Sequence, residues 1–172
     1  VLCNNAELSA QEGGVGDPLE VALLEAAEQA GIDTDALRSR YPEVREEAFD
    51  ADTKRMATFQ QTPNGYLVTA KGAPESILDA CSTVLTPSGP EPLREADWEE
   101  WMVEEQAVAA QGFRVLGLAT KTVEHVDAPA FEDLNLVGWV ILSDPPRRDV
   151  EGAIVRCRSA GIDVVMVTGD QP

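Results

Sequence analysis

The 172 residues suffice for one domain with its own hydrophobic core, plus a fragment of a second, and an apolar fraction of 44% argues against a disordered chain. Thirty-one acidic residues against 13 basic ones give a formal net charge of -18, which disfavours nucleic acid and anionic lipid as partners. Three separated cysteines and one histidine give no readable disulfide framework or zinc site, and no apolar run approaches the roughly 20 residues of a membrane helix.

The first 31 residues predict helices and loops. Residues 2–10 are expected to form a short helix, and a glycine-rich loop follows over residues 13–16. Asp17 as N-cap and Glu20 three residues later predict a second helix that opens with a capping box. Gly31 is expected to end it.

Beyond a short helix expected around Ala36, alternating polar and apolar residues predict strands over residues 44–49 and 55–60. Asn64-Gly65 predicts a type I′ hairpin turn, because asparagine and glycine readily take the positive φ that this turn requires. Residues 66–70 are therefore expected to return as the partner strand.

The next segment predicts two further helices and two buried strands. One helix is expected to begin at residues 72–75 and to run to about Cys81, followed by a proline- and glycine-rich loop over residues 86–92. The spacing of apolar residues predicts a long amphipathic helix that Gly112 ends. Strands are expected over residues 114–120 and 134–142.

The pattern changes at Asp144, where an Asp-Pro-Pro sequence interrupts the chain. A helix over residues 148–160 and a short apolar strand over residues 164–167 predict a strand-helix-strand unit of the parallel-sheet type. We therefore place a domain boundary here, with one domain over residues 1–143 and a partial second domain over residues 144–172.

Lys71 and Gly72 open the segment with the clearest chemical signal. A cation at a strand end, a glycine that lets a ligand approach the backbone and a helix N-terminus with free N–H groups suit an anionic or polar ligand. The alternative from local physics is an ordinary strand-to-helix turn with a solvated lysine.

Residues 71–75, Lys-Gly-Ala-Pro-Glu, resemble the signature of the nucleotide-binding domain of P-type ATPases of the calcium, sodium-potassium and proton pump branch. Several short motifs in one order are far more specific than any one of them. Further motifs similar to this family's follow one another in its order along the whole chain: Leu2-Cys3-Asn4-Asn5-Ala6, Gly16-Asp17-Pro18-Leu19-Glu20, Phe49-Asp50, Lys54-Arg55-Met56, Gly112-Phe113-Arg114-Val115-Leu116, Asp144-Pro145-Pro146-Arg147 and Met166-Val167-Thr168-Gly169-Asp170.

The resemblance implies an α+β fold, with a six- or seven-stranded antiparallel sheet flanked by helices and a C-terminal fragment of a haloacid-dehalogenase-like phosphorylation domain. It also implies a cytoplasmic ATP-binding domain of an integral membrane cation pump. Such a domain presents ATP to an aspartate outside this sequence, so the segment alone is expected to be inactive. A start without methionine and a stop at Pro172 are what we expect of a piece of a longer polypeptide.

The expected partners are therefore ATP and the remaining phosphorylation, actuator and transmembrane domains of the same chain. Mg²⁺ is expected in the intact pump only, with no metal ligand and no catalytic residue in this segment. We expect weak ATP binding dominated by the base. The transported cation stays open, with the calcium-pump-like branch preferred from residues 16–20 and 144–147.

Carried over residue by residue, the resemblance implies that Phe49 stacks on adenine, that Lys71 lies deep in the same pocket and that Glu20 faces the base. Lys54 and Arg114 are expected nearer the ribose and phosphates. Gly72 and Leu116 complete the expected nucleotide contacts. Contacts from the phosphorylation domain in the intact protein are expected from Asp144, Arg147, Thr168, Gly169 and Asp170.

Each assignment has a purely structural alternative: Glu20 as a helix cap, Phe49 as a core residue, Arg114 as cover for the long helix. A further basic residue that the family often carries before Lys54 is absent, since residues 50–53 read Asp-Ala-Asp-Thr. A domain that kept the fold but lost nucleotide binding is therefore one alternative. A stand-alone phosphatase is another, but the Asp-x-Asp sequences at residues 33–35 and 50–52 lack the apolar strand that its nucleophile motif needs.

Overall fold

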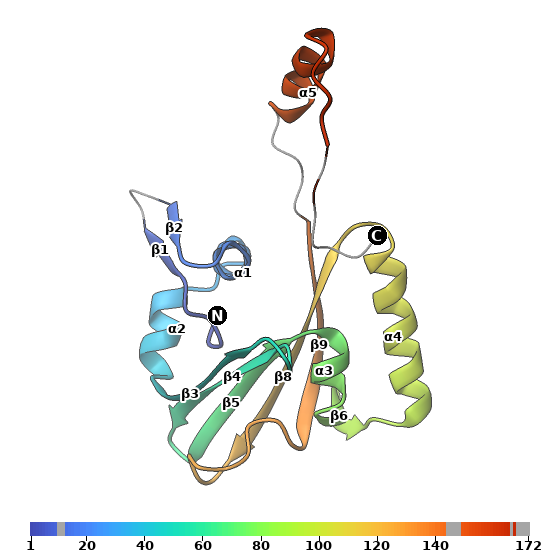
Figure 1. Cartoon of the computed structure of the whole chain (residues 1–172). Coiled ribbons are helices and arrows are strands. Elements are labelled where there is room, and N and C mark those ends of the chain that lie inside the picture. The colour runs from blue at the N-terminus through green and yellow to red at the C-terminus, as the bar shows by residue number, and fades with distance from the viewer. Residues whose placement is uncertain (10–12, 144–148, 166, 168–172) are drawn as a thin grey trace. The chain divides into compact units, whose positions relative to one another are not determined.

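The computed structural model describes residues 1–9, 13–143, 149–165 and 167. It divides into two compact units, Val1–Leu142 and Ser143–Pro172, which we describe separately. The first unit combines one large sheet with helices and a small hairpin (Figure 1). The predicted α+β fold class is confirmed.

The large sheet has seven strands in the order β3-β4-β5-β8-β9-β6-β7. All neighbouring strands are antiparallel except β6 and β9, so the sheet is mixed where the sequence predicted an antiparallel one. Parallel strands need a long connection, and here the chain passes through β7, a helix and β8 between β6 and β9. The strands are β3 (Glu43–Asp50), β4 (Arg55–Thr62), β5 (Gly65–Gly72), β6 (Cys81–Thr86), β7 (Gly89–Pro92), β8 (Arg114–Val123) and β9 (Leu134–Leu142).

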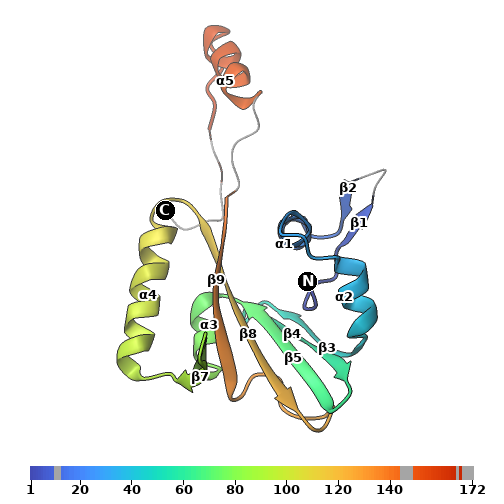
Figure 2. The same cartoon turned by 180° about the vertical axis from the view of Figure 1, so that it is seen from behind.

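Helices gather at two places on this sheet. Helices α1 (Pro18–Gln29) and α2 (Thr34–Arg40) lie toward the β3 edge, whereas α3 (Pro74–Leu78) and α4 (Glu95–Ala109) lie on the other side, and Figure 2 shows the same separation from behind. The main apolar core lies under α3, whose Ile77 and Leu78 pack with alternate residues of the central strands. Thr58 and Lys71, which alternate with core residues of β4 and β5, instead contact Leu2 and Cys3 of the N-terminal segment.

The helix expected over residues 2–10 is wrong. Its described residues, 2–9, contain no helix and end in β1 (Glu7–Ser9), which pairs with β2 (Gly13–Val15) in a two-stranded sheet. Asn4 explains the difference, because its side chain accepts a hydrogen bond from the Ala6 N–H at 2.9 Å and so competes with helical hydrogen bonding. β2 also replaces the loop expected over residues 13–16.

The β4–β5 hairpin is confirmed, but its turn is not of type I′. Thr62 pairs with Gly65, so Pro63 and Asn64 occupy the two central positions of the turn. Proline fixes φ near −65°, and Asn64 is not among the described non-glycine residues with positive φ. Gly65 instead takes the positive φ, at 126°.

Between α3 and α4 the sequence analysis missed a hairpin. Helix α3 ends at Leu78 instead of Cys81, and β6 and β7 occupy much of the segment expected to be helix end and loop. β6 pairs in parallel with β9, a contact between segments about fifty residues apart that no local sequence pattern predicts.

In the second unit, α5 (Val150–Ser159) confirms the predicted helix. The strand expected over residues 164–167 is wrong for its described residues, which lack strand structure, and Val165 and Val167 are exposed. A strand needs a hydrogen-bonded neighbour, and the described residues of this unit contain no other strand to pair with. Asp144, Arg147, Thr168, Gly169 and Asp170 lie outside the described residues.

Candidate functional site

A pocket of about 620 Å³ opens beside the ends of β4, β5 and β8, a size typical of small-molecule sites. All seven residues expected to contact nucleotide line it, although they come from five separate parts of the chain. The full lining consists of Asn5, Asp17, Leu19, Glu20, Glu46, Ala48, Phe49, Lys54, Met56, Lys71, Gly72, Ala73, Pro74, Arg114, Val115 and Leu116.

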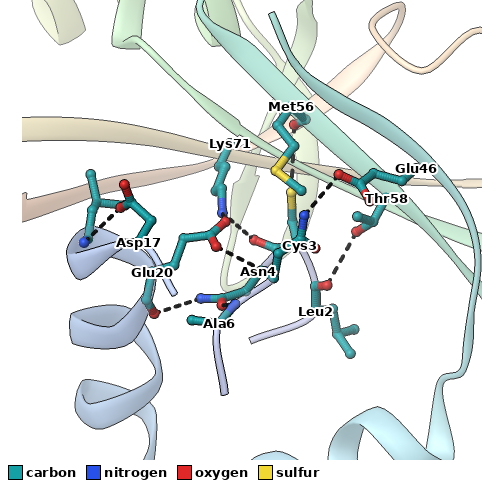
Figure 3. Close-up of polar contacts among 12 residues, drawn as sticks. Leu2, Cys3, Asn4, Ala6, Asp17, Glu20, Glu46, Met56, Thr58 and Lys71 are labelled. Atoms are coloured by element: carbon teal, nitrogen blue, oxygen red, sulfur yellow. Dashed lines mark hydrogen bonds and ion pairs between the residues drawn. The ribbon is translucent and has the colours of Figure 1, made fainter. Parts of the chain in front are cut away.

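The buried end of the pocket contains an ion pair between Lys71 on β5 and Glu20 on α1 (Figure 3). Their side chains are only 8% and 12% exposed. Lys71 Nζ also donates to the carbonyl oxygen of Cys3 at 2.8 Å, and the second Glu20 oxygen accepts from the Asn5 N–H at 3.1 Å. A cation and a carboxylate are therefore held in fixed positions by several partners each.

Glu20 does not cap α1, so the predicted capping box is wrong. Asp17 alone serves as N-cap, accepting from the Leu19 N–H at 2.9 Å, and the Glu20 carboxylate turns into the pocket instead. The attraction of the buried Lys71 ammonium outweighs a weak local hydrogen bond at the helix start. The alternative in which Glu20 is only a cap is therefore contradicted.

The segment over residues 2–6 lies against this buried end and lines the pocket through Asn5, a contact that was not predicted from the sequence (Figure 3). Asn4 Nδ2 donates to the Glu20 carbonyl oxygen at 2.8 Å, and Asn5 Nδ2 donates to Glu46 Oε1 at 3.0 Å. The motif Leu2-Cys3-Asn4-Asn5-Ala6 was the available signal, since it matched the family but suggested no local function.

The open end of the pocket is built from exposed side chains. Phe49 stands at the end of β3 with 61% of its surface exposed, which contradicts the alternative of a core residue. Lys54 has its Nζ 3.6 Å from Glu75 Oε1, and its side chain is 60% exposed. An exposed aromatic face beside a loosely paired cation is free to meet a ligand.

A tight turn over residues 50–54 presents Lys54. The Asp50 carboxylate accepts from the backbone N–H groups of Thr53 at 2.7 Å and Asp52 at 2.9 Å, which holds the pKa of Asp50 below its usual value. Asp33 likewise accepts from the Ala36 N–H as the N-cap of α2. Both Asp-x-Asp sequences therefore begin with a carboxylate that shapes the local backbone.

Gly72 fixes this turn against β5. A Cβ atom at Gly72 would lie 2.5 Å from the Lys54 carbonyl oxygen, and the neighbouring Ala73 N–H donates to the same oxygen at 2.9 Å. The close approach that requires glycine is thus made by the chain's own backbone, which corrects the expectation of ligand access. Lys54 itself takes a positive φ of 53° in this turn.

The floor of the pocket is apolar. Met56 on β4 is buried, and so are Val115 and Leu116 on β8, while Arg114 begins the same strand at the rim. An apolar floor with polar groups at one end is the usual composition of a site for a flat organic ligand.

Charges around the pocket balance, in contrast to the acidic chain. Three cations line it, and so do three carboxylates, those of Asp17, Glu20 and Glu46. The local excess of negative charge is therefore absent at this site, which removes an electrostatic barrier to an anionic ligand.

Two kinds of feature are absent from the residues that the structure describes. Among the described residues, no group of three or more histidine, cysteine, aspartate or glutamate side chains is arranged to hold a metal ion. None of the described helices has the length and apolar character needed to cross a membrane.

Comparison with known proteins gives consistent matches along the chain. Residues 1–149 match the family described as P-type ATPase, cytoplasmic domain N. The chain is 34% identical over 177 residues to calcium-transporting ATPase 1 of Bacillus cereus, and 38% identical over 183 residues to a sodium/potassium exporting P-type ATPase of Schizosaccharomyces pombe. It is 35% identical over 195 residues to the human sodium/potassium-transporting ATPase subunit alpha-3.

These alignments cover 99% of this chain but only 17% to 19% of each relative. The chain therefore spans less than a fifth of the length of the curated relatives it matches.

Proposed function

The chain belongs to the P-type ATPase cytoplasmic domain N family, and from this premise we propose that its pocket binds ATP. One observation carries the proposal: seven residues named from the sequence, in five separate parts of the chain, line a single pocket of about 620 Å³.

Adenine is proposed to lie between the buried end of the pocket and the Phe49 ring. The apolar floor, formed in part by Met56 and Leu116, suits a flat base, and Phe49 at the open end offers a ring face for stacking. The Glu20 carboxylate accepts hydrogen bonds and therefore suits the exocyclic amine of adenine, while Lys71 can donate to a ring nitrogen.

The open end is proposed to face the ribose and phosphates. Lys54 and Arg114 lie at this end. Lys54 forms an ion pair with Glu75 at 3.6 Å, and Arg114 forms none with the residues that the structure describes. Because Lys54 is exposed, its attraction for phosphate is screened by salt and modest in size. Binding energy is therefore expected to come chiefly from the base.

We propose that the longer protein is a P-type ATPase, an integral membrane pump. In it, this domain would present ATP to a phosphorylatable aspartate elsewhere in the chain. Mg²⁺ would act in that intact enzyme, together with the phosphorylation, actuator and transmembrane domains. Residues 144–172 are proposed to belong to the phosphorylation domain. The relatives are named for calcium, sodium and potassium, so the cation stays open.

An amide-resolved NMR titration with ATP, with and without Mg²⁺, tests the nucleotide proposal. Saturable shifts are expected around Glu20, Phe49 and Lys71, with little dependence on Mg²⁺. Phe49→Ala is expected to move their midpoint to about tenfold higher ATP, whereas Phe113→Ala, which removes another exposed ring outside the lining, leaves the midpoint unchanged.

Absence of saturable shifts at millimolar ATP in a folded sample would contradict the proposal. The chain would then be a domain that kept the family fold and lost its nucleotide, an alternative favoured by the acidic residues Asp50 and Asp52 before Lys54.

A further inference from the structure

Arg38 on α2 contacts the pocket wall from behind without lining the pocket itself. It borders a neighbouring cavity of about 330 Å³ on the other side of the N-terminal segment. Its Nη1 donates to the Ala6 carbonyl oxygen at 3.0 Å, and its Nη2 donates to the Asn4 carbonyl oxygen at 2.8 Å. Asn4 and Ala6 are both buried, and within the part of the chain that the structure describes this guanidinium is the donor to both carbonyl groups.

The two carbonyl groups flank Asn5, which contacts the pocket's carboxylate directly. The Asn5 N–H donates to Glu20 Oε2 at 3.1 Å, and Asn4 Nδ2 donates to the Glu20 carbonyl oxygen at 2.8 Å. The Asn4 carbonyl that accepts from Arg38 and the Asn5 N–H that donates to Glu20 belong to the same peptide unit, so one peptide group links the guanidinium to the carboxylate. Any movement of this segment changes the hydrogen bond that orients the carboxylate.

We infer that Arg38 is a positioning residue for the base end of the pocket and that it sets the preference for adenine through the segment over residues 4–6. This inference rests on the proposed function. With one Glu20 oxygen held by Lys71 and the other by the Asn5 N–H, the carboxylate presents acceptors in one fixed direction. A 6-amino purine can donate to it, whereas a 6-oxo purine brings an oxygen against it.

The test compares ATP and GTP dissociation constants in the wild type, Arg38→Ala and Arg40→Ala. Arg40 lies on the same helix, and its loss changes the net charge equally without touching residues 4–6. Arg38→Ala is expected to weaken ATP binding about tenfold, the equivalent of one well-placed hydrogen bond, while GTP binding changes less than about twofold. Arg40→Ala is expected to keep the wild-type ratio.

A second variant covers the case in which Arg38→Ala does not fold. Arg38→Lys keeps the charge, but its single ammonium group lacks the planar fork with which arginine reaches both carbonyl groups. An ATP to GTP affinity ratio between those of the wild type and Arg38→Ala is therefore expected. The Asn5 amide proton resonance should move in step with the ratio, which a general loss of stability would not produce.

An unchanged ATP to GTP ratio in folded Arg38→Ala or Arg38→Lys would overturn the inference, and so would equal weakening of both nucleotides. Either result leaves the proposed function standing as long as the wild type still shows saturable ATP shifts around Phe49. Failure of the wild type to bind ATP would instead remove the proposed function, and the inference with it.

Discussion

The two ends of the pocket are built in different ways. At the buried end, Lys71 and Glu20 are nearly inaccessible and are tied to the N-terminal segment by several hydrogen bonds. At the open end, Phe49 and Lys54 are mostly exposed, and Lys54 has one distant ion-pair partner. The charged groups of the buried end have protein partners without a ligand, whereas the open end offers exposed side chains to one.

This difference separates stability from affinity. Groups at the buried end already contribute to folding, since removing one leaves a buried charge without its partner. Groups at the open end contribute little to folding, so their loss is expected to appear in nucleotide binding alone. The following four changes test that division.

The largest effect is expected for Lys71→Met. This change leaves the Glu20 carboxylate buried without its cation, and we expect the free energy of unfolding to fall by roughly 3 kcal/mol. Urea denaturation measures the loss. Lys54→Met is the matched control at the open end, and an equal loss in both variants would contradict the division.

A pH effect is expected at the buried end through Cys3. Burial raises the pKa of this thiol from 9.0 to about 11. The unfolded chain therefore releases the proton at lower pH than the folded chain, so stability falls as pH rises from about 9 to about 11. The loss is roughly 2 kcal/mol for a shift of this size.

Denaturation curves at pH 8 and pH 11 for the wild type and Cys3→Ala measure this contribution. The variant is expected to lose less stability over this interval because it lacks the thiol. Identical losses in the two proteins would show that Cys3 does not titrate as its burial requires.

At the open end, Phe49→Ala is expected to change the free energy of unfolding by less than about 0.5 kcal/mol, because the ring is exposed. Its ATP dissociation constant is expected to rise about tenfold through lost stacking. Denaturation and titration of the same sample test both parts. A large loss of stability would show that the Phe49 side chain contributes to folding, as the groups at the buried end do.

The smallest effect is expected for Lys54→Ala. Its ion pair with Glu75 is exposed and contributes less than about 1 kcal/mol to stability. We expect ATP to bind about threefold more weakly at low salt, and AMP to bind as before, because only the outer phosphates approach this cation. Equal weakening of AMP would show that Lys54 acts on the base or ribose.

Much of the fold could be predicted from local signals. Helix α1 follows from Asp17 and Pro18, and the β4–β5 hairpin from alternation around a turn. The β6–β7 hairpin and the short β1–β2 pair were missed, since each has few residues and β6 joins the sheet through the distant strand β9. Pairing between distant segments leaves no periodic trace in a single sequence.

The site shows the same limit. Its seven expected residues were named from motif order, and they line one pocket. The partners of Glu20 could not be predicted, because hydrogen bonds from Asn5 and Lys71 depend on how a segment at the start of the chain crosses the sheet. Gly72 was assigned to ligand access because a close approach of backbone from β4 has no signature in the sequence.

Isotope-filtered NOE measurements on the protein with bound ATP test the central claim most directly. Contacts are expected from the adenine H2 and H8 protons to the Phe49 ring and the Met56 methyl group, both of which line the pocket. Saturable ATP binding with adenine contacts at residues outside this pocket would contradict the claim.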